Sequence, residues 1–447
     1  MAQAQAGPRA SRVSLLSLAW PPVVGALMAP FFPAVRAFPL LVAAQGLKPI
    51  VIVPGDGSNQ LEARLDKPKT VAWYCERKSD WFRLWLDTAS LLAGTRCWAD
   101  NIRLVYDERT QELRNNDGVE TRVPDFGGTS AFEELDPSVP FHGTAAFRDM
   151  VLGLVGAGYT RNASLRGAPY DFRYAPSSPE GARYIRSLKE LVEDTSRSND
   201  GSRVVLVSHS MGCLQVHYFL AQQTQSWKDR FVEKWIPLAG PWGGAAKELR
   251  LHASGDNQGV PVPSLEIREE QRSYETNFWL APVPRWFGGQ ALVTTAGRNY
   301  SAQDYGAFFD DIGFPSGKAL YRRVEGLTSG VEAPGVDVVC MYGLGVPTPL
   351  RFDYGSKGFD EQPSVFNGDG DGTVNDVSSR LCERWAQPGA QARPARAVRF
   401  SKVSHQGFLT DGAVLASIHR ELGLGAPALG AEGSREGGGS SSSLLVV

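Results

Sequence analysis

VVLVSHSMGCLQVHYFL, residues Val204 to Leu220, is the stretch that decides the fold class of this chain. Its four leading apolar residues are typical of a strand buried on both faces, and the apolar residues after Gly212 suit a buried helix. Between them lies the sharp turn of a nucleophile elbow, which would expose the hydroxyl of Ser210. Ser208 stands where this motif usually has glycine, but its side chain is small enough for the turn. The stretch predicts an α/β-hydrolase fold with Ser210 as nucleophile.

Short apolar runs elsewhere in the chain predict the remaining strands of a mainly parallel sheet. Each run ends at a turn rich in Gly, Ser or Asp; the runs are residues 49–53, 235–238, 336–342 and 397–400. Residues 182–195 and 412–422 have helical spacing. Because strands alternate with helices, we expect an α/β-hydrolase domain over residues 45–422, with its ligand site beyond the carboxyl ends of the strands.

Both ends of the 447-residue chain differ in composition from its middle. Residues 1–44 carry two arginines before an apolar stretch, which is typical of a secretory signal peptide and leader. A signal anchor is the alternative, but the prolines from Pro21 to Pro33 would interrupt a membrane helix. Residues 425–447 are low in complexity, and we expect them to be disordered. The net charge of −2 indicates no nucleic-acid partner.

The five cysteines lack the closely spaced pairs of a structural zinc site, so we expect no metal. In an oxidising compartment we expect disulfides Cys75–Cys97 and Cys340–Cys382, with Cys213 left as a buried free thiol. Closing the first loop would stabilise the fold by about 3 kcal/mol in the chain-entropy model. The two Asn-X-Ser triplets that begin at residues 162 and 299 make Asn162 and Asn299 the expected glycosylation sites.

Two insertions interrupt the alternation of strands and helices. Residues 73–100, bracketed by the first cysteine pair, would form a helix with large apolar side chains around most of its circumference. From the residues alone, an ordinary buried core helix is the preferred interpretation of that segment. Residues 251–331 are rich in Gly, Pro and charge but contain aromatic residues, and we expect them to form a cap or lid over the site.

A serine nucleophile needs a positioned base, and in this fold the base follows the acid along the chain. Four of the six histidines come after the elbow. His405 lies just beyond the last predicted strand, where such folds place the base. His217 and His419 lie on helix patterns and fit packing or surface roles, and His252 completes the set.

The acid is expected in the glycine-rich stretch 367–374, which contains Asp369 and Asp371. A calcium loop is the alternative, but the glutamate that would complete it is absent. We prefer Asp371. The oxyanion hole would use the backbone N–H of Met211 and that of Asp56, in the loop after the first strand. No metal or organic cofactor is required for this chemistry.

Ordered motifs spread between about residue 48 and residue 422 resemble the lecithin:cholesterol acyltransferase family. They are VPGD (53–56), NQLEA (59–63), LDKP (65–68), GAPYD (167–171), SMG (210–212), PWGG (241–244), GVPTP (345–349) and GDGTVN (370–375). The resemblance implies the same nucleophile, acid, base and oxyanion amides, and both disulfides. Asp56 is similar to the residue of the lysosomal members, whereas the plasma cholesterol acyltransferase has Cys there.

The resemblance also implies how the insertions are used. Segment 73–100 becomes a membrane-binding element in place of a core helix, and the segment from residue 251 to about 272 a mobile lid. The implied membrane-binding residues are Trp81, Phe82, Trp85, Leu91 and Leu92. The expected activity is that of a serine-dependent phospholipase A and O-acyltransferase at a phospholipid membrane surface. An acyl-serine would pass its acyl chain to water or to a lipophilic alcohol such as ceramide, in the lysosomal lumen or after secretion.

Three other functions are compatible with parts of the sequence. A secreted phosphatidylcholine-sterol acyltransferase would share the triad and the family motifs. A lipid-binding or transfer protein would retain the fold without turnover, which the intact Ser210, Asp371 and His405 argue against. A serine peptidase shares the same triad, and only the aromatic insertion and the lid favour lipid over peptide.

Overall fold

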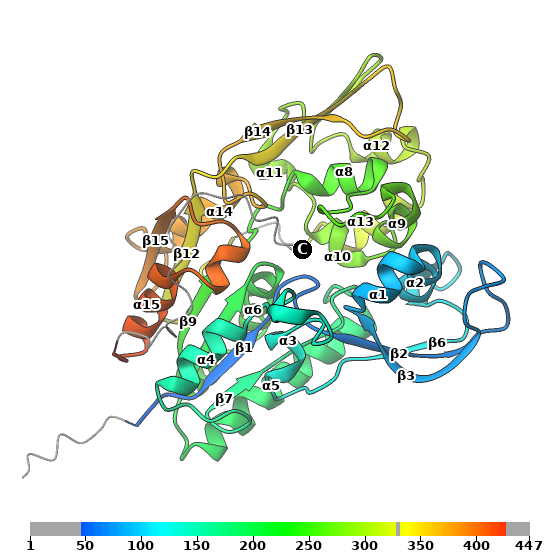
Figure 1. The fold of residues 1–447 in the computed structure, drawn as a ribbon. Coiled ribbons are helices and arrows are strands. Elements are labelled where there is room, and N and C mark those ends of the chain that lie inside the picture. The colour runs from blue at the N-terminus through cyan, green and yellow to red at the C-terminus, as the bar shows by residue number, and fades with distance from the viewer. Residues whose placement is uncertain (1–45, 328–330, 426–447) are drawn as a thin grey trace, which may run out of the picture. The chain divides into compact units, whose positions relative to one another are not determined.

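A computed structural model describes residues 46–327 and 331–425 of the chain (Figure 1). These residues belong, apart from Gly46, to a compact unit that spans Leu47–Val447, while a second unit spans Met1–Gly46. The expected signal peptide and leader and the expected disordered tail lie outside the described residues, except for Gly425. No helix in the described ranges has the length and apolar character needed to cross a bilayer.

A parallel six-stranded sheet forms the centre of the larger unit, in the order β15-β12-β9-β8-β1-β7. The strands are β1 Ile50–Val53, β7 Leu165–Gly167, β8 Val204–His209, β9 Val232–Leu238, β12 Val338–Leu344 and β15 Ala395–Ser401. The five strands expected from apolar runs are confirmed. β7 was not expected, because its three residues are too few to show a pattern.

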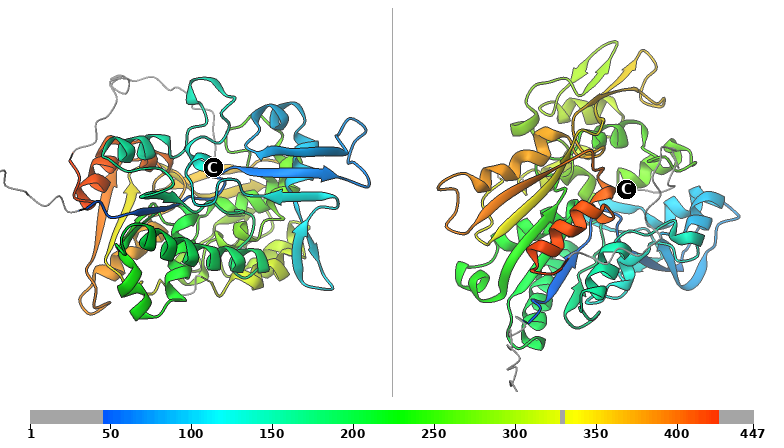
Figure 2. Two further views of the ribbon diagram at one scale, coloured as in Figure 1. Left: turned by 90° about the horizontal axis from the view of Figure 1, so that it is seen from below. Right: turned by 60° about the vertical axis from the view of Figure 1, so that its left-hand side comes forward.

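Helices cover both faces of this sheet, which explains why its strands are apolar along their whole length. On one face Ile50 and Ile52 pack with side chains of α4 Arg148–Gly156 and α15 Gly412–Glu421. On the other face Val51 and Val53 pack with α5 Pro179–Ser198 and α6 Met211–Ala221 (Figure 2). Alternate residues of one strand therefore serve two separate cores, and this α/β-hydrolase architecture is the fold class expected from the sequence.

The helix expected over residues 73–100 is confirmed only in the second half of that segment, where two short helices lie, and is wrong in the first half, which forms a β-strand. Trp81, Phe82 and Trp85 lie on β3 Lys78–Trp85, which pairs with β2 Leu61–Asp66. Most β3 side chains are partly buried on either side, so the strand shows no clear alternation along the sequence. Neighbouring elements are β6 Val119–Arg122, α1 Thr88–Ala93, α2 Thr95–Ile102, β4 Leu104–Asp107 and β5 Glu112–Asn115.

A cap of short helices and a small sheet lies above the carboxyl ends of the central strands (Figure 1). Its helices are α8 Lys247–Ser254, α9 Ser264–Gln271, α10 Glu275–Trp279, α11 Pro284–Phe287, α12 Tyr305–Asp311 and α13 Gly317–Val324. Its sheet has the order β11 Asn299–Tyr300, β10 Val293–Thr295, β13 Thr348–Gly355, β14 Ser364–Gly368. β13 and β14 follow the expected insertion at 251–331, so the cap draws on a later part of the chain as well.

The remaining short elements connect these layers. They are α3 Ser130–Glu133, the 3₁₀ turn Pro140–His142, α7 Gln225–Phe231, α14 Asp376–Ser379, and the 3₁₀ helices η2 Arg380–Ala386 and η3 Gln406–Leu409.

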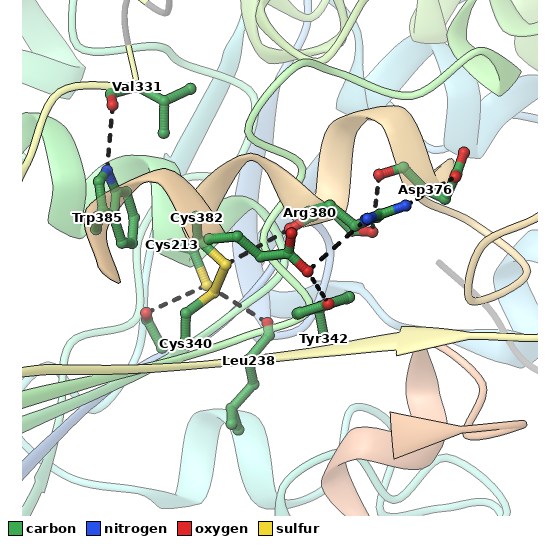
Figure 3. Close-up of a disulfide and its surroundings, with 12 residues drawn as sticks. Cys213, Leu238, Val331, Cys340, Tyr342, Asp376, Arg380, Cys382 and Trp385 are labelled. Carbon is green, nitrogen blue, oxygen red and sulfur yellow. Dashed lines mark hydrogen bonds and ion pairs between the residues drawn. A yellow bond between two sulfur atoms is a disulfide. The ribbon is translucent and has the colours of Figure 1, made fainter. Parts of the chain in front are cut away.

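Two disulfides tie the outer elements together, and they join the pairs expected from the sequence. Cys75–Cys97 links the loop before β3 to α2, and Cys340–Cys382 links β12 to η2. Cys213 is buried and unpaired, with its Sγ 3.4 Å from the carbonyl oxygen of Leu238 (Figure 3). The second bridge anchors the segment that follows the aspartate loop of the candidate site.

Candidate active site

Ser210 occupies the turn between β8 and α6 in a backbone conformation that non-glycine residues rarely adopt, with φ 53° and ψ −130°. The turn brings α6 so close to the loop after β1 that a Cβ on Gly212 would collide with the carbonyl of Pro54. Ser208 fits the position usually taken by glycine because its hydroxyl has partners: it accepts from Trp235 Nε1 at 2.9 Å and donates to Cys213 Sγ at 3.3 Å. The tertiary contacts thus hold the serine in its strained backbone conformation.

The structure brings Ser210, His405 and Asp371 together from three distant parts of the chain. His405 Nε2 lies 2.8 Å from Ser210 Oγ, and His405 Nδ1 lies 2.8 Å from Asp371 Oδ2. Asp371 is fully buried and His405 is almost so. Asp369 does not take part, because its Oδ1 accepts the backbone N–H groups of Gly345 and Gly370. This is the arrangement of a serine, a base and an orienting carboxylate.

The other histidines after the elbow make different contacts. His217 Nε2 lies 2.7 Å from the carbonyl oxygen of Glu332, and His419 Nδ1 lies 3.1 Å from that of Gly425. His252 is buried in the cap, where its ring lies 4.4 Å from that of Phe278. None of these three contacts involves Ser210.

Asp371 is held in its ionised form by its surroundings. Burial by itself would raise its pKa, but the charge and hydrogen bond of His405 and two backbone N–H groups lower that pKa below its ordinary value. The two N–H donors are Val374 at 2.7 Å and Thr373 at 3.0 Å, both to Oδ1. An ionised carboxylate at this position favours the imidazole tautomer with hydrogen on Nδ1, which leaves Nε2 free to accept the serine proton.

The loop after β1 lies against the nucleophile, where an oxyanion hole is expected. A Cβ on Gly55 would lie 2.8 Å from the Cβ of Ser210, so the loop that carries Asp56 packs directly against the nucleophile. Met211 is the first residue of α6, and such N–H groups have no acceptor within their own helix. Of the two amides expected to stabilise an oxyanion, that of Met211 directly follows Ser210, and that of Asp56 belongs to the loop packed against it.

Asp56 is half-buried as a residue, but its carboxyl oxygen Oδ1 is buried. Its Oδ1 has no hydrogen-bond partner within the described part of the chain. Burial raises the pKa of Asp56 to about 6, with Lys247 and the N–H of Gly57 opposing the rise. Two further buried carboxyls, Glu248 and Glu270, have pKa values raised to about 8, again through burial first. Glu270 lies in the expected insertion at 251–331 and Glu248 just before it, and the sequence offered no other signal for either glutamate.

A cavity of about 70 Å³ begins at Asp56. Its walls come from the oxyanion loop, from the first insertion through Trp85 and Leu91, and from the segment between α8 and α9, which includes Val260 and Val262. Trp85 donates its indole N–H to the carbonyl of Gly57, which fixes the cavity wall to the oxyanion loop. The cavity is apolar on most of its surface.

The residues expected to bind membrane are found in three different environments. Leu92 is exposed, whereas Leu91 is buried and, with Trp85, faces the cavity. Phe82 is half-buried, as is Trp81, whose ring lies 4.2 Å below the Arg122 guanidinium.

The most exposed aromatic side chains of this region were not singled out from the sequence. They are Trp73, 94% exposed, and Tyr74, 56% exposed, in the loop before β3. The signal that could have found them is an aromatic pair directly before Cys75 in a stretch rich in Lys and Arg.

Two further expectations concern the asparagines of the Asn-X-Ser triplets and side chains that could bind a metal. Asn162 and Asn299 are both exposed, as glycan attachment requires. Over residues 46–327 and 331–425, no three His, Cys, Asp or Glu side chains are grouped so that they could hold a metal ion.

Comparison with known proteins gives consistent matches along most of the chain. The family model described as lecithin:cholesterol acyltransferase matches residues 81–321 and 319–419. The mouse protein named lysosomal phospholipase A and acyltransferase is 44% identical over 403 residues, covering 89% of this chain and 95% of the relative. The human protein of the same name is 44% identical, covering 84% and 90%. Human phosphatidylcholine-sterol acyltransferase is 40% identical, covering 85% of each chain.

Proposed function

The chain belongs to the lecithin:cholesterol acyltransferase family and is an acyl-transferring enzyme, and on that basis we propose that it is a serine-dependent phospholipase A and O-acyltransferase. The substrate would be a glycerophospholipid in a membrane surface. The observation that carries this proposal is the chain of contacts from Ser210 through His405 to Asp371, with both distances at 2.8 Å.

The reaction starts with Ser210 Oγ attacking an ester carbonyl of the phospholipid while His405 Nε2 takes its proton. The N–H groups of Asp56 and Met211 donate to the oxyanion, and each such donor is worth about 3 kcal/mol in the transition state. His405 then gives the proton to the leaving lysophospholipid oxygen, and an acyl-serine remains. Asp371 stays ionised throughout and stabilises the imidazolium.

The second half of the reaction repeats these steps with another hydroxyl. Water yields a free fatty acid, whereas a lipophilic alcohol such as ceramide yields an acylated alcohol. The apolar walls around Trp85 and Leu91 favour the alcohol, because they exclude water from the acyl-serine. Residues of segment 251–272, among them Val260 and Val262, form one wall of the cavity at Asp56, and this segment would move as a lid when substrate enters.

Membrane contact is assigned to the exposed aromatic pair together with Leu92. Trp73 and Tyr74 are amphipathic side chains that suit the bilayer interface, and the Cys75–Cys97 bridge ties their loop to α2. Trp85 and Leu91 serve as substrate-facing residues in this proposal. The lysosomal lumen is the proposed site of action, and secretion is the alternative. The pKa of the Asp56 carboxyl is raised to about 6, so this group is neutral in an acidic compartment and does not oppose the negative charge of the oxyanion there.

The test is an incubation of purified protein with phospholipid vesicles that contain either ceramide or cholesterol, at pH 4.5 and at pH 7.4, with products identified by mass. We expect fatty acid and acylceramide at pH 4.5, and none with Ser210→Ala. Cholesteryl ester with a neutral optimum would replace this proposal by that of a secreted phosphatidylcholine-sterol acyltransferase. Turnover that survives Ser210→Ala would refute the serine mechanism.

A further inference from the structure

His209, the residue before the nucleophile, is fully buried and makes a contact that the reaction described above does not use. It is the last residue of β8, and its Nε2 lies 3.0 Å from the backbone carbonyl oxygen of His405. A carbonyl oxygen can only accept, so Nε2 carries the hydrogen and donates it. A side chain next to the serine thus binds the main chain of the base.

Both backbone polar groups of His405, its N–H and its C=O, make hydrogen bonds. Its N–H donates to the carbonyl oxygen of Asp371 at 2.7 Å, and its C=O accepts from His209. His405 lies in a loop after β15, outside any strand or α-helix, so no regular ladder fixes its main chain. These two hydrogen bonds, one to the acid and one to the elbow, therefore define where the imidazole stands.

The opposite edge of the His209 ring faces the oxyanion loop. Nδ1 lies 3.2 Å from the point that a Cβ on Gly55 would occupy, and across the described residues it has no hydrogen-bond partner. The two imidazole rings lie 4.8 Å apart, and the Phe147 ring packs edge-on against His209 at 6.0 Å. The His209 side chain therefore contacts the base and the oxyanion loop, and the His209 main chain is bonded directly to the nucleophile.

We propose that His209 is a positioning residue, which sets the distance between His405 Nε2 and Ser210 Oγ by donating a hydrogen bond to the His405 carbonyl. The inference rests on the proposed serine mechanism and adds a residue to it. A misplacement of the base by a fraction of an ångström weakens proton transfer while leaving the substrate contacts in place. Loss of the hydrogen bond should thus lower kcat more than it raises KM.

His209 performs this role as a neutral imidazole. Burial, followed by the proximity of His405, lowers the pKa of His209 to about 3, although Asp371 and the hydrogen bond oppose the shift. The side chain therefore stays uncharged at pH 4.5. A neutral donor also avoids a second positive charge beside the imidazolium that His405 becomes during the reaction.

The test compares two amides that differ in reach. The side-chain nitrogen of His209→Gln extends about as far as Nε2, whereas that of His209→Asn ends near the position of Nδ1. With a soluble ester substrate we expect kcat to fall about 30-fold in His209→Asn, with KM changed less than about threefold, and to recover to within about fivefold of wild type in His209→Gln. Labelling of Ser210 by a fluorophosphonate should follow the same order.

The matched control is His419→Gln, since His419 is also buried and contacts a backbone carbonyl, that of Gly425, but lies on α15. That contact is made through Nδ1, whose place the Gln nitrogen does not take. This variant should leave kcat unchanged. Equal losses in the Gln and Asn variants of His209, or no loss in either, would overturn the inference. The serine mechanism would still stand in that case if Ser210→Ala is inactive. Labelling rates are taken on folded protein, so that a stability loss in one variant does not hide the comparison.

Discussion

Glu248 should make the enzyme less stable as pH rises, and replacing it by Gln should remove that dependence. It lies in the first turn of α8, is 2% exposed, and its Oε2 has no partner among the residues that the structure describes. Burial raises its pKa from 4.5 to about 8; Lys247 opposes the rise, while Asp56 and Asp256 add to it. The folded protein therefore holds a proton on Glu248 that the unfolded chain releases at neutral pH.

The sign and size of the effect follow from this difference in proton binding. Between pH 4.5 and 8 the folded state binds more protons than the unfolded state, so stability falls with rising pH across that window. At pH 7.5 the penalty is about 4 kcal/mol, and at pH 4.5 it is below about 1 kcal/mol. Gln has nearly the same volume and cannot ionise. Glu248→Gln should therefore stabilise the protein by about 3 kcal/mol more at pH 7.5 than at pH 4.5.

The assay is thermal or urea unfolding of both proteins at the two pH values. Glu190→Gln, at an exposed position of α5, is the control and should show no difference between the two conditions. A gain for Glu248→Gln that is the same at both pH values would mean that the amide simply packs better. No gain at pH 7.5 would show that the Glu248 carboxyl is not neutral in the folded protein.

The remaining predictions concern the site, the membrane surface and the disulfide. Asp371→Asn should lower kcat about 10⁴-fold, because an amide no longer favours the tautomer with hydrogen on Nδ1. Pre-steady-state measurement of the acylation rate checks this, and a loss below tenfold would contradict it. Asp56→Asn should raise activity at pH 7.4 relative to pH 4.5, because the carboxyl ionises above about pH 6 and then opposes the oxyanion; an unchanged pH–rate profile would discard this role. Trp73→Ala should weaken binding to phospholipid vesicles in a flotation assay while leaving hydrolysis of a soluble ester intact, and equal losses in both assays would point to misfolding instead. Cys75→Ser combined with Cys97→Ser should lower the free energy of unfolding by about 3 kcal/mol in denaturant titrations, and no change would show that the loop is held by packing alone.

The central sheet and the elbow were predictable because their signals are local. A parallel strand covered by helices on both faces must be apolar along its length, as β1 and β8 are, and a sharp strand-to-helix turn needs small residues around Ser210. Both requirements appear in a few consecutive residues. The position of His405 could also be predicted from the sequence, since this fold places its base after the last strand.

Other features depended on partners far away in the chain. Residues 78–85 became a strand because β2 was available to pair with them, and nothing within the segment itself distinguishes strand from helix. Asp369 and Asp371 stand two residues apart with similar neighbours, and only the folded loop turns one toward His405 and the other toward Gly345. In the same way, Leu91 and Leu92 are identical in chemistry, yet one faces the cavity and one faces solvent. The local sequence shows which residues are apolar enough to be buried. The tertiary structure decides which element each of them packs against, because those partners come from distant parts of the chain.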